Sequence, residues 1–147
     1  MYYTVSTGIG SGLVVDGKIY HGINNPEPGH QILSKSGESL ESLASGSALK
    51  RKYNKEPKDI EGSPEWEEAM EFIAIGISNS ILHFSPEIVV IGGGMTKHGE
   101  VFFTPVKKYL KKYVTIIPLP IVVPSTLGQD NGLIGALELA RTVNQYG

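Results

Sequence analysis

The residues best suited to bind a ligand lie near the start of the sequence, in the stretch STGIGSG. Gly8, Gly10 and Gly12 alternate there with other residues, and Thr7 and Ser11 add hydroxyl groups. Glycine tolerates positive φ and lets a ligand approach its backbone N–H, and successive N–H groups in such a turn form an anion-binding nest. The stretch therefore predicts a phosphate-binding turn between two strands. A tight hairpin with a bulge would use the same glycines, so their spacing alone leaves both interpretations open.

Three more glycines, Gly92 to Gly94, directly follow the apolar segment Glu87–Ile91 and precede a predicted helix. In open α/β sheets, ligands bind beyond the carboxyl ends of the strands, so this cluster is a second candidate ligand loop. It is not a Walker A loop, because no Gly-Lys-Ser/Thr follows, and it lacks the spacing of a dinucleotide-binding fingerprint. A sterically convenient turn from strand to helix is the alternative.

The elements that must position these loops are an antiparallel hairpin and then alternating helices and strands. Asp16-Gly17 favours a type I′ turn between two short strands. Ser63 is the predicted N-cap of a helix that starts at Pro64, and the segment Glu87–Ile91 is typical of a central strand that is buried on both faces. We expect strands at 2–6, 13–15 and 18–20, with a glycine turn at 7–12 and a loop at 21–30; a brief strand at 31–33; a helix at 40–53 interrupted at Gly46; a helix at 64–85; a strand at 87–91; a helix at 102–113; a strand at 121–123; and a last helix at 132–143.

Composition narrows the class of protein. The chain has 147 residues, 40% of them hydrophobic, and a net charge of −2, which fits one α/β domain over residues 1–147 and no nucleic-acid partner. It has no cysteine, which excludes disulfides and thiolate metal sites and is typical of a cytoplasmic protein. No apolar stretch reaches the length of a membrane span, so we expect no membrane partner.

Five motifs, taken together and in order, resemble the ROK family of sugar kinases and related repressors. The motifs are STGIGSGLVVDGKIYHG, EPGH, LESLASGSALKRKY, PEIVVIGGGM and STLGQDNGLIGALELA, and the resemblance spans Thr4 to Ala140. It implies an actin-like, ribonuclease-H-type fold, here its C-terminal lobe with a mixed sheet. It also implies transfer of the γ-phosphoryl group of ATP to a hexose hydroxyl, with Mg²⁺ as cofactor, so the implied small-molecule partners are a sugar and a nucleotide.

The resemblance also implies roles for individual residues. Thr7, Gly8 and Gly10 match the phosphate-binding loop of the second lobe, and Gly93, Gly94 and Met95 match the adenosine-binding loop. Glu27 and His30 of EPGH, together with Glu41 of LESLASG, match the family's sugar-binding residues. Carboxylates and a neutral imidazole are groups that bind sugar hydroxyls well. Taken singly, each of the three also fits a structural role, as an exposed loop acid, a turn histidine or an acid at a helix start.

The sequence departs from the family pattern in two ways. Many members carry a cysteine-rich zinc motif between the histidine and the LES segment, whereas this chain has no cysteine there, so we expect no structural zinc. The family's first phosphate loop and catalytic aspartate precede the TGIG strand, and neither is found in this sequence. Its only aspartates are Asp16, Asp59 and Asp130, and we assign no catalytic residue among them.

Three interpretations follow from this pattern. The chain is the C-terminal lobe of an ATP-dependent hexose kinase that acts when an N-terminal lobe completes it, or it is an inactive remnant that binds sugar or nucleotide or dimerises, or it is a generic α/β domain that has retained no ligand. We also expect exposed apolar surface to bind a partner, which is a second copy of the chain or the other lobe. The predicted helix at 132–143, with Leu133, Ile134, Leu137 and Ala140, is the candidate surface.

Overall fold

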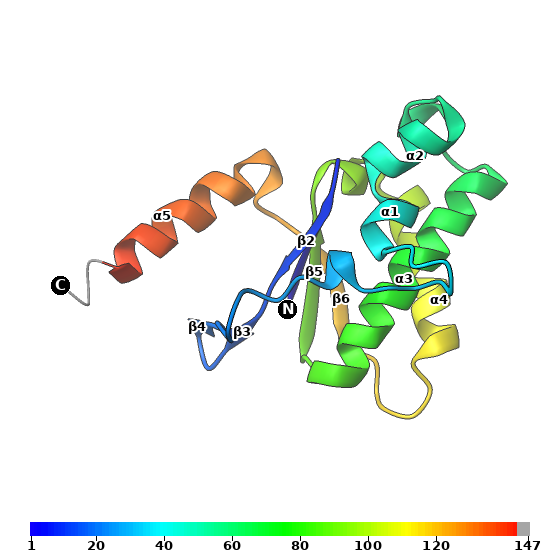
Figure 1. The fold of residues 1–147 in the computed structure, drawn as a ribbon. Coiled ribbons are helices and arrows are strands. Elements are labelled where there is room, and N and C mark those ends of the chain that lie inside the picture. The colour runs from blue at the N-terminus through cyan, green and yellow to red at the C-terminus, as the bar shows by residue number, and fades with distance from the viewer. Residues whose placement is uncertain (144–147) are drawn as a thin grey trace.

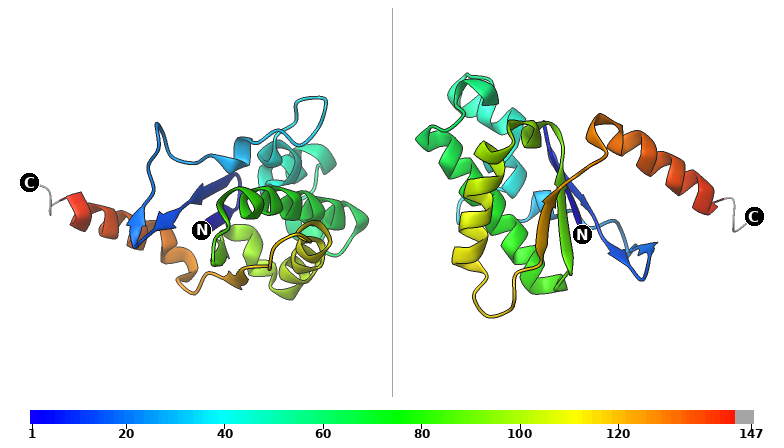
Figure 2. Two further views of the ribbon diagram at one scale, coloured as in Figure 1. Left: turned by 90° about the horizontal axis from the view of Figure 1, so that it is seen from below. Right: turned by 180° about the vertical axis from the view of Figure 1, so that it is seen from behind.

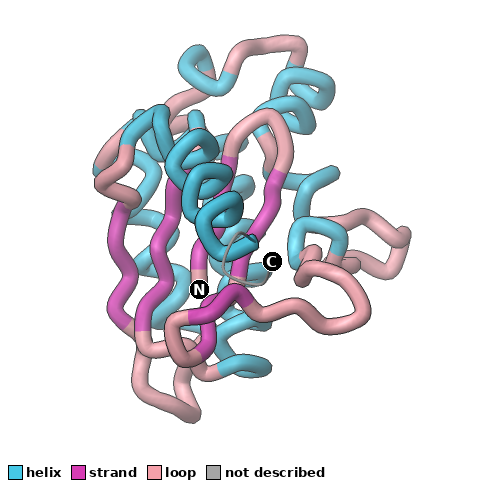
Figure 3. The backbone as a smooth tube through the Cα atoms, turned by 90° about the vertical axis from the view of Figure 1, so that its left-hand side faces the viewer, coloured by secondary structure: helices cyan, strands magenta, loops and turns pink. Residues whose placement is uncertain are grey.

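A four-stranded mixed sheet organises the computed structural model, which describes residues 1–143 (Figure 1). The strand order is β2-β1-β5-β6, in which β1 pairs with β2 antiparallel and with β5 parallel, and β5 pairs with β6 parallel. Figure 3 shows the four strands side by side. The predicted α/β class, with an antiparallel pair first and parallel strands after it, is confirmed. The strands are β1 (Tyr2–Val5), β2 (Ile9–Gly12), β3 (Val14–Val15), β4 (Lys18–Ile19), β5 (Ile88–Gly92) and β6 (Ile121–Pro124); the α-helices are α1 (Leu40–Ala44), α2 (Gly46–Tyr53), α3 (Pro64–Phe84), α4 (Glu100–Tyr113) and α5 (Asn131–Val143); and the 3₁₀ helices are η1 (Pro28–His30), η2 (Pro57–Asp59), η3 (Gly94–His98) and η4 (Gly128–Asp130).

Two local expectations need correction. The predicted glycine turn at 7–12 is wrong, because Ile9–Gly12 is a strand that pairs with β1 and only the residues before it form the turn. The predicted strand at 31–33 is a single bridge between Ile32 and Ser39. The predicted interruption of the helix at 40–53 is confirmed: the backbone of Ser45 is extended, and its hydroxyl caps a second helix that begins at Gly46.

The predicted burial of β5 on both faces is also wrong. The strand is central in the sheet, yet Ile88 is 43% exposed and Val90 is only half-buried. The helices α3 and α4 cover one face of the sheet, and α5 extends away from the other side (Figures 1 and 2). The apolar residues of β5 are therefore covered from one side only.

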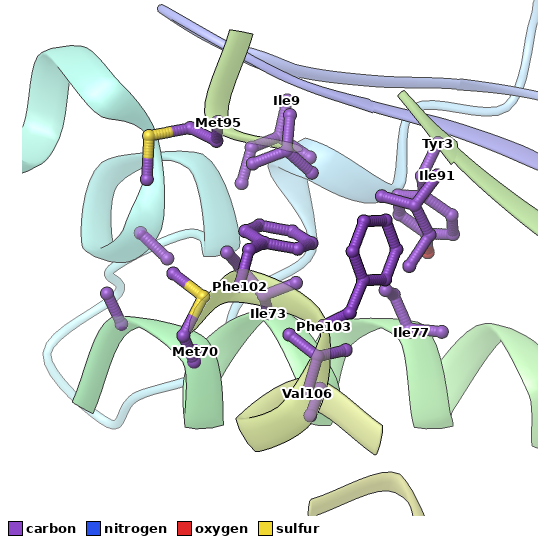
Figure 4. Packing of buried hydrophobic residues seen from close by; sticks show 14 of the residues in the cluster. Tyr3, Ile9, Met70, Ile73, Ile77, Ile91, Met95, Phe102, Phe103 and Val106 are labelled. Carbon is purple, nitrogen blue, oxygen red and sulfur yellow. The ribbon is translucent and has the colours of Figure 1, made fainter. Parts of the chain in front are cut away.

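The core lies between the sheet and α3, where the predicted stripe is confirmed. Ser63 caps α3 by accepting a hydrogen bond from the N–H of Trp66, and the indole of Trp66 donates to the carbonyl of Val101 at 2.9 Å. Figure 4 shows how the stripe of α3 meets β1, β5 and α4. The stripe consists of Trp66, Met70, Ile73, Ile77 and Ile81, all at most 1% exposed; Tyr3, Ile91, Phe102, Phe103 and Val106 pack against it from the other elements.

Polar bonds inside this core tie the sheet to α3. The hydroxyl of Tyr3 lies 2.6 Å from that of Ser80 and 3.4 Å from the carbonyl of Gly76. Burial raises the pKa of Tyr3 to about 12, even though the bond with Ser80 acts in the opposite direction. The phenol therefore stays neutral, which suits its place at the centre of the core.

Outside the core, two three-membered clusters join α3 to α4. Glu67 accepts hydrogen bonds from Lys108 and Tyr109. One turn later, Glu71 accepts from Lys112 and Tyr113. The bond from Lys108 lowers the pKa of Glu67, and the bonds from Tyr113 and Lys112 lower that of Glu71. The clusters therefore fix the relative rotation of the two helices.

These lowered pKa values predict how stability depends on pH. The folded-state pKa of each glutamate lies below its ordinary value of 4.5. The stabilisation from each bond is therefore complete above about pH 4.5 and is lost as the pH falls through the folded-state value. In urea titrations between pH 7 and pH 3, we expect the Glu67→Gln/Glu71→Gln variant to lose less stability on acidification than the parent. Parallel losses in the two proteins would contradict this.

The glycines after β5 give a second prediction. Gly93 has φ = 101°, and a Cβ there would lie 2.4 Å from the carbonyl oxygen of Val5. Gly94 has no positive φ, and its Cβ would meet only the Ser6 hydroxyl, at 3.1 Å. We expect Gly93→Ala to lower the free energy of unfolding by about 2–3 kcal/mol through overpacking and strain.

The neighbouring variant Gly94→Ala is the control, with an expected loss of under about 1 kcal/mol because a hydroxyl can rotate away. Chemical denaturation of both variants measures the difference. Equal losses would show that the two glycines are not distinguished by their backbone surroundings.

Candidate functional site

The turn between β1 and β2 is short and tightly packed. The N–H of Ser6 donates to the carbonyl of Gly8 at 2.9 Å. None of Gly8, Gly10 and Gly12 has positive φ, so positive φ does not account for these glycines. Close approach explains Gly8 instead, because a Cβ there would lie 2.6 Å from Oε2 of Glu41. At Gly10 a Cβ would lie 3.3 Å from Cγ2 of Thr4, its partner in β1, and at Gly12 it would meet nothing.

Glu41 connects the turn to α1. Ser39 caps this helix by accepting from the N–H of Ser42, which places Glu41 in the first turn. Its Oε2 then accepts a hydrogen bond from the N–H of Ile9 at 2.7 Å. α1 packs on α3 at Gly76, where the absence of a Cβ makes room for Leu40. The carboxylate therefore lies between the helix layer and the start of β2.

α2 holds the same turn from its other side. The N–H of Gly46 donates to the carbonyl of Ser6 at 2.7 Å, and that of Ser47 donates to the carbonyl of Thr7 at 3.3 Å. Gly46 is required at this point, because a Cβ would lie 2.9 Å from the Ser6 oxygen. The first two N–H groups of α2 are thus bonded to the turn.

A pocket of about 610 Å³ opens where α2, the turn and η3 meet. Its volume falls in the range of small-molecule sites, roughly 300–1,000 Å³. In Figure 1 this region is the end of the sheet that lies nearest to α2. Its lining includes Thr7 from the turn, Ser47 and Lys50 from α2, and Gly94, Met95 and His98 from η3. The pocket therefore lies at the carboxyl ends of β1 and β5, as expected for this class of sheet.

The structure brings together only part of the predicted phosphate and adenosine sets. Thr7, Gly94 and Met95 line this pocket, with Met95 forming a buried floor at 3% exposure. Gly93 lines a second pocket of about 510 Å³ on the side of the sheet that faces α5. Gly8 is turned toward Glu41, and Gly10 lies within the paired strand β2.

The predicted sugar residues gather around the start of β2. Gly29, in η1, is so close to this strand that a Cβ would lie 2.0 Å from the carbonyl oxygen of Ile9. Glu27 and His30 flank this contact with exposed side chains. Glu41 bonds the N–H of the same Ile9. The EPGH segment is thus folded back beside the start of α1, which is the arrangement that a shared site requires.

Gln31 is a structural residue of the site that the sequence analysis did not identify. Its amide nitrogen donates to the carbonyls of Pro28 and Gly76, and its amide oxygen accepts from Asn79 at 2.8 Å. It therefore anchors η1 to α3 and keeps Glu27 and His30 at the strand. Only the position of Gln31 directly after EPGH hinted at this role.

The pocket is also lined by ionisable residues to which the sequence analysis assigned no role. Lys50 forms an ion pair with Glu56, and the hydrogen bond to Glu56 raises the pKa of Lys50. Nδ1 of His98 lies 3.2 Å from Oε2 of Glu61, and its ring packs edge-on against Trp66. Lys50 lies within the LESLASGSALKRKY motif, but its neighbours Arg51 and Lys52 are also basic, so the motif alone did not distinguish it.

Two further properties bear on ligands. Within residues 1–143, no group of three or more histidine, cysteine, aspartate or glutamate side chains is arranged to hold a metal ion. Among the helices of the same residues, none combines the length and the apolarity needed to cross a bilayer.

Comparison with known proteins identifies the family. The ROK family profile matches residues 1–143. The chain is 30% identical to the fructokinase of Pediococcus pentosaceus, in an alignment that covers 96% of this chain and 55% of that protein. Nearly all of this chain therefore aligns, but it spans only about half the length of this relative.

Solved structures agree in fold. The ROK hexokinase of Thermus thermophilus superposes with a TM-score of 0.76 at 28% identity, over 95% of this chain and 57% of that one. A ROK family glucokinase from Streptomyces griseus, solved with glucose and AMPPNP, gives a TM-score of 0.80 at 24% identity, over 96% of this chain and 60% of that one. With a family match along almost its whole length and the same mixed sheet, the chain belongs to the ROK family.

Proposed function

We propose that this chain is the sugar- and nucleotide-binding C-terminal lobe of a cytoplasmic, ATP-dependent hexose kinase. The observation that carries the proposal is the pocket at the carboxyl ends of β1 and β5, with the β1–β2 turn on one side and η3 on the other. The fructokinase and hexokinase relatives support a hexose as substrate. The glucose and AMPPNP bound to the Streptomyces griseus protein support the two ligand classes.

The nucleotide would occupy this pocket. We assign its phosphates to Thr7, which lines the pocket, and to the backbone of Gly8 and Gly10 in and beside the turn. Gly93 shapes the loop, while Gly94 and Met95 line the space for adenosine. ATP supplies the phosphoryl group when it is bound. The described residues do not form a site of their own for Mg²⁺, so the family's metal would depend on ligands other than a carboxylate cluster of this lobe.

The sugar would lie at the start of β2, next to the phosphate end of the nucleotide. Glu27 and His30 present exposed polar groups there. Glu41 uses Oε2 to accept from Ile9, so Oε1 is the oxygen for a sugar hydroxyl. Placing both ligands on either side of the β1–β2 turn brings the hydroxyl toward the terminal phosphate, which is the geometry that phosphoryl transfer needs.

Transfer also needs a general base, and the three aspartates are not placed for it. Asp16 lies in the turn between β3 and β4, Asp59 in η2 and Asp130 in η4. None of them lines the pocket beside Thr7. The proposed kinase therefore takes its base from an N-terminal lobe, which relatives about twice as long have room for.

The sugar site is tested by NMR. In ¹H–¹⁵N spectra of the 147-residue protein titrated with fructose, glucose and mannose, we expect shifts at residues of η1 and β2 with a dissociation constant near millimolar, roughly −4 kcal/mol. Weak binding is expected because solvent competes for hydrogen bonds at exposed side chains. Glu27→Gln and His30→Ala should abolish the shifts and leave the melting temperature nearly unchanged.

The controls are His21→Ala and Glu38→Gln. His21 is exposed and bonded to Asn25, and Glu38 is bonded within its own loop to Ser34 and Ser36. Both variants should retain the shifts. An absence of shifts in the parent protein at tens of millimolar hexose would refute the sugar site.

A second function, self-association, is favoured by the exposed apolar face of α5. Leu133 is 62% exposed and Leu137 is 54% exposed, and the helix extends away from the sheet (Figure 2). Such a surface is typical of a protein interface. We expect sedimentation at micromolar concentration to show a dimer or larger species, and Leu133→Glu/Leu137→Glu to shift it toward monomer. A monomeric parent protein over this range would contradict the prediction.

A further inference from the structure

The pocket proposed for the nucleotide is also lined by charged and ionisable side chains to which no role has been assigned above. Lys50, Glu56, Lys58 and His98 line the pocket together with Thr7 and Ser47. His98 is bonded to Glu61 and packed on Trp66, and Lys58 is an exposed residue of the short helix η2. Lys50 differs from both, because it belongs to the helix whose first residues hold the phosphate turn.

The position of Lys50 on α2 directs it toward the pocket. It follows Ser47 by three residues, so the two lie on the same face of the helix. Ser47 donates its N–H to the carbonyl of Thr7 and lines the same pocket. Long side chains on helices lean toward the N-terminus of the helix. Lys50 is therefore within one turn of the place where the phosphates are proposed to lie.

Glu56 holds Lys50 in this position. Its Oε1 lies 2.5 Å from Nζ of Lys50. Glu56 is also the N-cap of η2: its carbonyl accepts from the N–H of Asp59 at 2.9 Å, and its own N–H donates to Asp59 Oδ2 at 3.3 Å. The backbone of Glu56 is thus held at the start of η2, and its carboxylate is bonded to Lys50. An ammonium group has three N–H donors, so Lys50 can keep this bond and still donate to a ligand.

We propose that Lys50 binds the phosphate oxygens of the nucleotide and that Glu56 is its positioning residue. The inference rests on the proposed function, since it assumes a nucleotide in this pocket. It adds a cation to a phosphate site that otherwise consists of a hydroxyl and backbone groups.

The same helix offers a matched control. Lys52 forms an ion pair with Glu68 at 2.9 Å, and the exposed fractions of the two side chains, 49% and 50%, resemble the 64% and 48% of Lys50 and Glu56. Glu68 belongs to α3, and neither Lys52 nor Glu68 lines the pocket. The two ion pairs are therefore of the same type and similarly exposed, and they differ in that only Lys50 and Glu56 line the pocket.

Calorimetric titration of the 147-residue protein with ATP, ADP and adenosine tests the proposal. We expect Lys50→Met to weaken ATP and ADP binding by about tenfold, the effect of one charge-assisted hydrogen bond, and to change adenosine binding less than twofold. Glu56→Gln should weaken ATP binding by a smaller factor, and the Lys50→Met/Glu56→Gln variant should bind ATP no more weakly than Lys50→Met. Lys50→Arg should bind more tightly than Lys50→Met. Lys52→Met should bind all three ligands as the parent does.

Three results would overturn the assignment: an unchanged ATP affinity in Lys50→Met, an equal loss for adenosine and ATP, or an equal loss in Lys52→Met. A merely structural role of Glu56 would weaken adenosine and ATP alike, so the ratio of the two dissociation constants distinguishes positioning from folding. If the parent protein binds none of the three ligands, the proposed function fails together with the inference. If the parent binds ATP and Lys50→Met binds it equally well, the inference alone fails.

Discussion

The backbone of Ile9 is the point on which the candidate site depends. Its N–H is bonded to the Glu41 carboxylate, and its carbonyl oxygen is in contact with Gly29. The same residue is the register partner of Val5 at the end of β1, and its side chain is part of the core. The backbone of one residue thus joins the sheet, α1 and the EPGH segment. A displacement of Ile9 would move the groups proposed for the sugar and the turn proposed for the phosphates together.

The sequence predicted the elements whose signals are local. Ser63, Pro64 and a repeat of apolar residues were sufficient to place α3, and the Asp16-Gly17 dipeptide marked the turn between β3 and β4. The order of strands and helices followed from the same signals. The ROK motifs then located the residues at the pocket and at the start of β2, although each motif is short.

The sequence failed where the cause lies far along the chain. The glycines around Gly8 were explained by positive φ or by a ligand at the backbone, but the close neighbour of Gly8 is Glu41, which no spacing rule connects to it. The burial of β5 was predicted from its composition, whereas the covering of its second face depends on where α5 lies. Lys50 lies within a family motif and Glu56 outside it, so only the folded chain shows that the two form an ion pair at the pocket.

The double role of Ser45 has a mechanical consequence. Its N–H closes α1 by donating to the carbonyl of Glu41, while its hydroxyl opens α2 by accepting from Ala48. The residue is 2% exposed, so no water can substitute for either bond. Two short helices joined in this way share a rigid corner instead of a flexible joint. A displacement of α2 would therefore also displace α1, which carries Glu41.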